Sequence, residues 1–348
     1  MTSSDRLRLL VLGGTGLVSS AVAAQALALG HDVTCVARGT GGSPPPGARL
    51  VRTDRNTPGA LDALRGEQFD AVVECATLSL RWVQDALRSV RADHWTFVSS
   101  VSVYADTYSP GQCARTAPLR PPLPDPGIGY DPAVDPEPSQ ATYGGVKLAC
   151  EQAVMDATDG RAFVVRPGLI VGPGDDVSPF GYWPLRMARG GAAVVPADLA
   201  ADGSPVPAQV VDVRDLARWI VDQAAARAEG VFDAVGPAVR LADLLGEVAD
   251  EVGSDTLELV PVAEEELLAA GVQPWTGPRS LALWPPRALH GALARDATSS
   301  FAAGLRTRPI AQTAAAVLRD RLGRGVGARP VAGLNPIEEA ALLRLLGR

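Results

Sequence analysis

The chain has 348 residues, of which 47% are hydrophobic and 20% are charged, a composition that excludes an intrinsically disordered chain and a small disulfide-stapled scaffold. Its formal net charge of -7 argues against nucleic acid as a partner, because a phosphate backbone attracts basic surfaces. Four widely separated cysteines and three histidines without paired spacing indicate neither a metal site nor a disulfide framework. No apolar run approaches the roughly 20 residues that span a bilayer, so we expect a cytoplasmic protein that does not bind membranes.

The first part of the chain alternates short apolar runs with segments of helical pattern. Strands are predicted at 8–13, 31–37, 48–52, 69–75 and 94–100, and helices up to Gly30, at 58–65 and at 80–91. Repeated strand–helix units are typical of a parallel, doubly wound sheet. The predicted fold class is therefore α/β, with a Rossmann-type sheet.

A segment rich in proline and glycine, from 105 to 138, interrupts this alternation. After it the pattern predicts a helix at 140–157, a strand at 162–166, and a strand–helix–strand series at 209–211, 213–227 and 230–235 that resumes the sheet. Asp212 and Asp215 have the spacing of helix caps, and we interpret them as caps rather than as site residues.

Beyond Gly236 the pattern predicts a smaller lobe. It contains helices at 241–252 and 264–270, an irregular stretch at 275–286, and a last helix opened by Asn335 and Pro336. We therefore expect a sheet domain over residues 1–170, completed by about 205–236, and a substrate-binding lobe made of 171–204 and 237–348.

The segment from Gly13 to Ser19 lies where the first predicted strand meets the first helix. Bare backbone in such a turn can approach a pyrophosphate, and the amino end of the helix supplies free N–H groups and a partial positive charge. Ser19 takes the third position, which is normally glycine, and its side chain is small. The turn predicts a dinucleotide cofactor, held by Gly13, Thr15, Gly16, Leu17 and Val18.

Arg38 directly follows the second predicted strand, where the adenosine ribose of a dinucleotide would lie. An arginine there pairs with the 2′-phosphate of NADP. We therefore expect the domain at residues 1–170 to bind NADP(H), with NAD(H) as the alternative. The alternative is that Arg38 is an ordinary solvated side chain or stacks on the adenine of either cofactor. Asp54 either bonds the adenine amino group or caps a turn, and Ala76, which follows the 69–75 strand, is also counted as a cofactor-binding residue.

Tyr143 and Lys147 are four residues apart in the helix predicted at 140–157, so both side chains project from one face. A phenol in water ionises near pH ~10, too high for proton exchange at neutral pH, and a nearby ammonium group favours the phenolate. The tyrosine could therefore act as an acid or a base, although such spacing also occurs by chance on helix surfaces.

A serine cluster, SSVSVY from Ser99 to Tyr104, ends the strand predicted at 94–100, where ligands gather in open α/β sheets. The glycine turn, this cluster, YGGVK and the later RPGLIVGPGD resemble, in order and position, the extended short-chain dehydrogenase/reductase family, the NAD(P)-dependent epimerase/dehydratase group. The resemblance covers about residues 7 to 240.

The resemblance implies a role for each matching residue. Ser100 would hydrogen-bond the substrate oxygen, Tyr143 would transfer a proton, and Lys147 would hold the nicotinamide ribose and favour the phenolate. Pro167 and Gly168 would pass beside the nicotinamide amide, and hydride would move to or from the ring. Ser102 is a candidate second substrate contact, and a strand-end cap is its alternative interpretation.

The sequence departs from the dehydratases of that group, which carry two carboxylates after this strand. The corresponding positions here are Ser100, Val101 and Ser102, so dehydration is disfavoured. Leu169 and Val171 replace the asparagine and tyrosine that tend to accompany sugar-nucleotide binding. We therefore expect an NADPH-dependent oxidoreductase acting on a ketone or secondary alcohol of a sugar-like, aminocyclitol or other specialised metabolite.

Two further hypotheses concern the substrate. Gly144 and Gly145 are costly inside a helix, and bare backbone at Gly145 would leave room for a bulky polar substrate, with close helix packing as the alternative. The acidic balance suits a small, cationic substrate, although a solvated acidic surface explains it more simply. The sequence leaves open whether the protein forms a homodimer.

Two other functional classes remain at this point. One is a sugar epimerase that retains its cofactor and shows no net redox change. The other is a non-catalytic relative that binds a dinucleotide or RNA, which the low pI of about 5.1 and the intact Ser100, Tyr143 and Lys147 disfavour.

Overall fold

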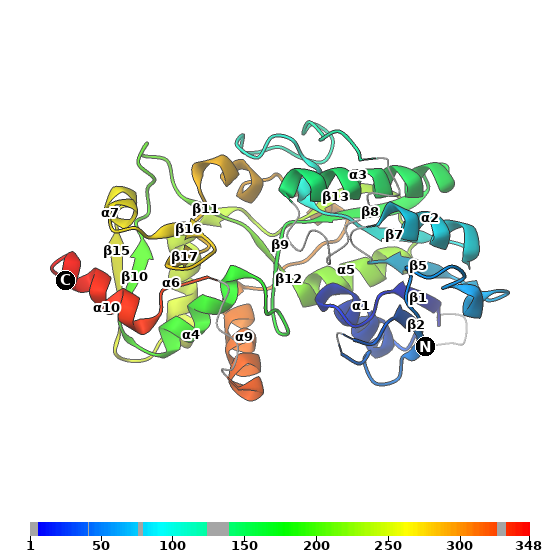
Figure 1. Cartoon of the computed structure of the whole chain (residues 1–348), viewed down its shortest axis with the longest axis horizontal. Coiled ribbons are helices and arrows are strands. Elements are labelled where there is room, and N and C mark those ends of the chain that lie inside the picture. Colours follow the sequence, from blue (N-terminus) through cyan, green and yellow to red (C-terminus); the bar gives the residue numbers. More distant parts are fainter. Residues whose placement is uncertain (1–5, 41, 76–78, 124–138, 326–331) are drawn as a thin grey trace.

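The computed structural model describes residues 6–40, 42–75, 79–123, 139–325 and 332–348. They form two lobes side by side, with the strands of a twisted sheet at one end of the molecule and the C-terminal helices at the other (Figure 1). Two thin ribbons, β9 (Leu169–Val171) and β12 (Val210–Asp212), lie between the lobes (Figure 1).

The sheet has seven parallel strands in the order β13-β8-β7-β5-β1-β2-β3. Its strands are β1 (Arg8–Leu12), β2 (Asp32–Ala37), β3 (Arg49–Arg52), β5 (Ala71–Glu74), β7 (Trp95–Val98), β8 (Ala162–Pro167) and β13 (Gly230–Ala234). Successive residues of β1 face opposite sides, because Leu9 and Val11 join one buried cluster while Leu10 and Leu12 join another. The predicted fold class, α/β with a doubly wound parallel sheet, is confirmed.

Helices cover both faces of this sheet (Figure 1). α1 (Leu17–Ala28) and α5 (Val213–Ala225) pack together on one face, and α2 (Leu80–Ser89) and α3 (Gln140–Ala157) pack together on the other. Side-chain oxygens cap three of the four: Ser79 begins α2, Ser139 begins α3 and Asp212 begins α5. The helix predicted at 140–157 is confirmed.

Two predictions for this lobe were wrong. The helix predicted at 58–65 is only a short 3-10 turn, Asp62–Leu64, because Gly59 has a φ of +71°, outside the helical region. The strand predicted at 209–211 does not join the large sheet. As β12 it pairs with β9 in a separate parallel ribbon, because both segments have already passed the carboxyl edge of the sheet.

The second lobe has its own buried cluster, drawn from residues between 171 and 342. Its elements are α4 (Tyr182–Ala188), β10 (Gly191–Pro196), β11 (Pro207–Ala208), β14 (Val239–Arg240), α6 (Leu241–Val252), β15 (Leu257–Val262), α7 (Glu264–Ala269), β16 (Gln273–Trp275), β17 (Ser280–Ala282), α8 (Thr298–Ala302), α9 (Ile310–Arg324) and α10 (Pro336–Leu345). Helices α6, α7 and α10 confirm predictions. The predicted irregular stretch holds two short paired strands, β16 and β17.

Helix α9 was not predicted. Most of its buried positions carry small or polar side chains, such as Thr313, Ala314 and Ala316, so its apolar stripe is weak in the sequence. Within the described part of the chain, no helix combines the length and apolarity needed to cross a bilayer.

Candidate functional site

The turn between β1 and α1 is built from glycines that no other residue could replace. Gly13 has a φ of +131° and Gly14 a φ of +117°. A Cβ on Gly13 would lie 2.9 Å from Cβ of Ser19, and one on Gly14 would lie 2.6 Å from Cβ of Cys35. The backbone is therefore bare where it would approach a pyrophosphate, as the dinucleotide prediction requires.

Ser19 tightens this turn. Its hydroxyl accepts a hydrogen bond from the Gly16 N–H at 3.2 Å and donates to the Gly16 carbonyl at 3.2 Å. Gly16 is the N-cap of α1, so the first N–H groups of that helix follow directly and give the turn a partial positive charge. These features fit a bound diphosphate.

A loop of the second lobe reaches the same turn. A Cβ on Gly174 would lie 3.6 Å from Cδ1 of Leu17, and the Gly174 N–H donates to the Asp320 carboxylate on α9 at 3.0 Å. Val18 packs against the core beneath the turn. Leu17 therefore stands between the turn and the second lobe, and the cofactor contacts of Leu17 and Val18 stay predictions.

A cleft of about 280 Å³ extends from this turn along the carboxyl ends of β2 and β3. It brings together Gly13, Thr15, Arg38 and Asp54, which the sequence had marked for cofactor binding. Asp54 accepts a hydrogen bond from the Asn56 N–H at 2.9 Å, so it caps a turn and lines the cleft as well. Ala76 lies outside the described residues.

A second arginine, Arg52, stands beside the mouth of this cleft and was missed in the sequence. It pairs with Ala37 across β2 and β3, and its guanidinium lies 3.1–3.3 Å from the position of a Cβ on Gly39. Arg38 and Arg52 are both exposed, and neither has an ion pair with a described residue. The sequence does contain a signal for Arg52, because this residue ends the predicted strand that follows the one before Arg38.

Ser100 lies where β7 ends and a 3-10 helix, η3 (Val101–Val103), begins. Its hydroxyl accepts a hydrogen bond from the Ser102 N–H at 3.1 Å and lies 3.1 Å from the Ser102 hydroxyl. Ser100 is thus held at the carboxyl edge of the sheet, as predicted from the strand pattern. Ser102 takes part in this cap, and its substrate contact stays a prediction.

Helix α3 touches η3 backbone to backbone. A Cβ on Gly144 would lie only 2.0 Å from the Ser102 carbonyl oxygen, so Gly144 allows an approach that no side chain would permit. This contact brings Tyr143, the residue before Gly144, to the segment that holds Ser100.

The expectation that Gly145 leaves room for substrate was wrong. A Cβ on Gly145 would lie 2.8 Å from Cγ of Leu123 and 3.1 Å from the Pro121 carbonyl oxygen, and the Leu123 N–H donates to the Gly145 carbonyl at 3.0 Å. The chain itself fills this space. Close packing, the alternative interpretation, explains the second glycine.

Lys147 is the only lysine in the sequence, and every other residue counted as Lys or Arg is an arginine. It is 1% exposed, and its ammonium group donates to the Val98 carbonyl at 2.7 Å and lies 4.9 Å from the centroid of the Phe97 ring. No carboxylate of the described residues forms an ion pair with it. The ammonium is therefore anchored at the end of β7, without an ion pair to a described carboxylate.

Pro167 ends β8, and Gly168 follows it beside β13. The Gly168 N–H donates to the Ala234 carbonyl at 3.2 Å, and a Cβ on Gly168 would lie 2.7 Å from Cγ1 of Val235. The backbone at Pro167 and Gly168 is thereby fixed at the carboxyl edge, as the predicted role beside the nicotinamide requires.

A buried polar network behind these residues escaped the sequence analysis, because its members are far apart in the chain. Arg166 donates twice to Glu151, at 2.9 and 2.6 Å, and once to the Tyr104 hydroxyl at 2.9 Å. Tyr104 donates in turn to Asp233, which also binds Arg295 at 2.8 Å. Burial and the nearby Asp233 carboxylate raise the pKa of Tyr104 well above its usual value, so its phenol stays protonated.

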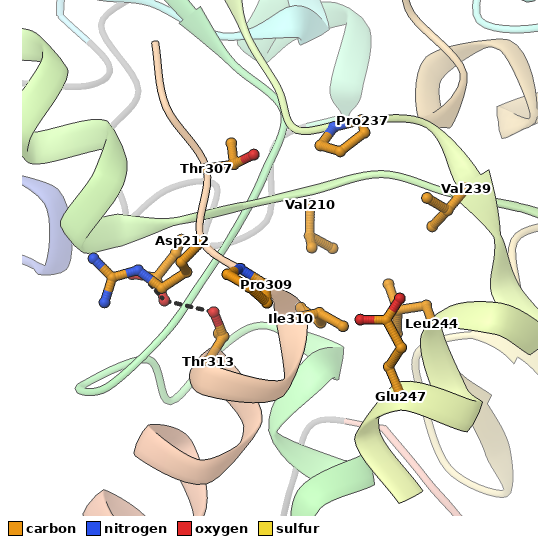
Figure 2. A pocket seen from close by; sticks show the side chains of 11 residues that line it. Val210, Asp212, Pro237, Val239, Leu244, Glu247, Thr307, Pro309, Ile310 and Thr313 are labelled. Atoms are coloured by element: carbon orange, nitrogen blue, oxygen red, sulfur yellow. Dashed lines mark hydrogen bonds and ion pairs between the residues drawn. The ribbon is translucent and has the colours of Figure 1, made fainter. Parts of the chain in front are cut away.

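A further cleft, of about 180 Å³, lies where the two lobes meet, between β12, α6 and the start of α9 (Figure 2). Asp212 at its edge accepts from the Arg214 N–H at 2.8 Å and from the Thr313 hydroxyl at 2.7 Å, and Asp215 binds Arg308 at 2.6 Å. The interpretation of Asp212 as a helix cap is confirmed. Burial opposes its ionisation, but the bonds from Arg214 and Thr313 prevail and lower the pKa of Asp212.

Comparison with known proteins identifies a relative of similar sequence. The 2'-dehydrokanamycin reductase of Streptomyces kanamyceticus is 33% identical over 212 residues, which are 57% of this chain and 53% of that protein. The chain thus spans about half the length of this relative.

Solved structures with a similar fold include WbmG of Bordetella bronchiseptica in complex with NAD and UDP, with a TM-score of 0.61, 17% identity, and coverage of 92% of this chain and 96% of that chain. Another is the UDP-glucose 4-epimerase of Thermus thermophilus in complex with NAD, with a TM-score of 0.60, 18% identity, and coverage of 91% and 100%. At these identities the likeness shows the fold alone.

The sequence profile of the NAD dependent epimerase/dehydratase family matches residues 9–232, a range that contains the glycine turn, Ser100, Tyr143 and Lys147. The resemblance noted in the sequence is confirmed, and the chain belongs to the NAD dependent epimerase/dehydratase family, whose members are NAD(P)-dependent enzymes.

Proposed function

We propose that this protein is an NADPH-dependent reductase of a ketone in an aminated sugar or aminocyclitol, working in reverse as an alcohol dehydrogenase. The observation that carries the proposal is the single lysine of the chain, buried one helical turn from Tyr143 with no carboxylate partner among the described residues. A buried ammonium without a counter-charge is costly, and a role in proton transfer explains why it is kept.

In this proposal Ser100 donates a hydrogen bond to the substrate carbonyl oxygen and Tyr143 delivers its hydroxyl proton to the same oxygen. A nicotinamide bound in this site would supply the hydride for the carbonyl carbon. The phenolate left on Tyr143 is stabilised by the Lys147 ammonium until solvent returns the proton, so the substrate gains one hydride and one proton in each turnover.

The preference for NADPH rests on Arg38 and Arg52. A 2′-phosphate would meet two guanidinium groups that no described carboxylate neutralises. The preference for an aminated substrate is supported by the name of the relative from Streptomyces kanamyceticus, which acts on a kanamycin derivative, and by the net charge of -7.

The test is the loss of nicotinamide absorbance when the purified protein is mixed with NADPH or NADH and a ketone. The ketones are 2'-dehydrokanamycin, a keto-aminocyclitol and, as the matched control, a keto-sugar without amino groups. We expect oxidation of NADPH with the aminated ketones, slower oxidation of NADH, and a ~100-fold or larger loss of rate in Tyr143→Phe. No oxidation with any ketone would refute the reductase, and an unchanged rate in Tyr143→Phe would refute the role of Tyr143.

An epimerase is the second candidate, and family membership is the observation that favours it. An epimerase would release a product of inverted configuration with no net change of nicotinamide absorbance, and it would be purified with its dinucleotide. The same assay therefore separates the two activities. A non-catalytic dinucleotide- or RNA-binding protein would show neither result.

A further inference from the structure

Two buried carboxylates lie close to Lys147. Glu151 is one helical turn beyond it on α3, where the side chains of residues four apart meet, and Glu74 ends β5. The charges of four groups act on the pKa of the Cys150 thiol, namely those of Lys147, Glu74, Glu151 and Arg55. These groups therefore share one region of the interior. Either carboxylate is placed where it could neutralise the ammonium.

Each of these carboxylates is instead bound by an arginine. Arg166 donates to both oxygens of Glu151, at 2.9 and 2.6 Å, and Arg55 donates to both oxygens of Glu74, at 2.9 and 2.8 Å. The Ser99 hydroxyl also donates to Glu151. The side chains of Arg166 and Glu151 are 4% and 5% exposed, and those of Arg55 and Glu74 are 8% and 0% exposed.

Within the described part of the chain, the other groups recorded against Lys147 bring no negative charge. They are the Val98 carbonyl and the Phe97 ring on β7, and the thiols of Cys75 and Cys150. Burial raises the pKa of Cys150 to about 12 and that of Cys75 further, so both thiols are neutral at working pH. The two arginine-bound carboxylates are therefore the anions that decide the charge in this region.

Stability alone does not explain two such pairs. Removing two charges from water costs about as much as their attraction returns, and apolar residues of similar volume often stabilise a core better. The planar fork of arginine, however, fixes both carboxylate oxygens in one direction. Here both oxygens of each carboxylate are taken up by an arginine, and neither carboxylate forms an ion pair with Lys147.

We propose that Arg166 and Arg55 are positioning residues that hold Glu151 and Glu74 away from Lys147, so that the ammonium keeps its full charge for Tyr143 and the cofactor ribose. This inference rests on the proposed function of Tyr143 and Lys147. It assigns to the arginines a specific electrostatic task, which can be measured on the protein without cofactor or substrate.

The single lysine makes the experiment direct. Protein labelled with ¹⁵N-lysine gives one side-chain signal, that of Lys147, whose pH titration is followed by NMR. In parallel, the ultraviolet difference spectrum between each protein and the same protein carrying Tyr143→Phe follows ionisation of that phenol. Both titrations use the full chain without ligands.

The variants are chosen to shift the two titration midpoints in opposite directions. In Arg166→Met, Glu151 is released toward Lys147, and we expect both titration midpoints to rise by about one pH unit. In Glu151→Gln, the unpaired Arg166 adds positive charge, and we expect both midpoints to fall. The double variant removes both charges and should return both midpoints to those of the wild type. General damage to the fold would not produce opposite shifts that cancel.

The neighbouring buried pair supplies the matched control. Arg295→Met removes the partner of Asp233, which is bonded to Tyr104 rather than lying beside Lys147, and should leave both midpoints unchanged. If Arg166→Met does not fold, Arg55→Met and Glu74→Gln repeat the comparison on the second carboxylate. Unchanged midpoints in the folded variants would overturn this inference, whereas the reductase would be refuted only by the activity assay.

Discussion

The ammonium of Lys147 donates to the carbonyl of Val98 at 2.7 Å, which ties the middle of α3 to the last residue of β7. Ser100 follows Val98 by two residues, and Tyr143 precedes Lys147 by one helical turn. One contact therefore sets the positions of the proposed proton donor and of the hydroxyl that binds the substrate oxygen.

Replacing Lys147 tests whether this position needs a lysine or only a charge. Lys147→Arg keeps the charge but places a larger, planar group in a site that is 1% exposed, and we expect a loss of about 1–3 kcal/mol in unfolding free energy and a ~10²-fold fall in kcat. Lys147→Met keeps the volume and removes the buried charge. We expect it to match or exceed the wild-type stability while losing a similar fraction of kcat.

Chemical denaturation and steady-state rates measured on the same preparations separate the two effects. A Lys147→Arg variant with wild-type kcat would contradict the requirement for a compact ammonium group. A Lys147→Met variant that unfolds would show that the lysine is structural instead.

The arginines at the mouth of the adenosine cleft predict cofactor selectivity. In Arg38→Asp we expect the ratio of kcat/KM for NADPH over NADH to fall at least ~10-fold, because a 2′-phosphate would meet a carboxylate. Arg52→Ser should lower the same ratio by a smaller factor. Fluorescence binding of both dinucleotides to each variant checks this without a substrate, and Arg65→Ser, an exposed arginine paired with Asp62, is the control. Equal ratios in all four proteins would refute the assignment.

The sequence located the elements that carry the candidate site wherever a local pattern holds the information. The glycine turn, the end of β7 and the spacing of Tyr143 and Lys147 depend on neighbours a few residues away, and the turn and the helix were located correctly. The Arg166 network was missed, because Tyr104 and Asp233 are 129 residues apart and no local pattern relates them. Gly145 was misinterpreted for a similar reason. The space beside it is filled by Pro121 and Leu123, which no local pattern in the helix reveals.

Gly144 in α3 predicts a contrast in stability with Gly246, a glycine in α6. A Cβ on Gly144 would lie 2.0 Å from the Ser102 carbonyl oxygen and 2.7 Å from its carbon, whereas a Cβ on Gly246 in α6 meets nothing within 4 Å. Gly144→Ala must therefore separate α3 from η3, and we expect a loss of roughly 2 kcal/mol or more in unfolding free energy. Gly246→Ala should gain about 0.5–1 kcal/mol, since alanine is the better helix former.

Activity distinguishes the same two variants. Because Gly144 lies against the segment that holds Ser100, a folded Gly144→Ala protein should lose kcat, while Gly246→Ala should keep it. Equal stability of the two variants, measured by urea denaturation, would contradict the packing described for α3.

His94 predicts how stability depends on pH. It is 3% exposed, and burial, together with the charge of Arg227, lowers the pKa of this histidine to about 4 from its ordinary value of 6.5. Between these two values the unfolded chain binds a proton that the folded protein does not, so unfolding free energy falls as pH decreases from 6.5 to 4. Above pH 6.5 both states are neutral at this residue, and its contribution is constant.

Replacing this histidine should remove its contribution. In His94→Gln the slope of unfolding free energy against pH between 4 and 6.5 should be shallower than in the wild type, and urea denaturation at several pH values measures both slopes. His290→Gln is the control, because that side chain is only half-buried and its slope should change less. Identical slopes for the wild type and His94→Gln would mean that burial does not lower the pKa of His94 in the folded protein.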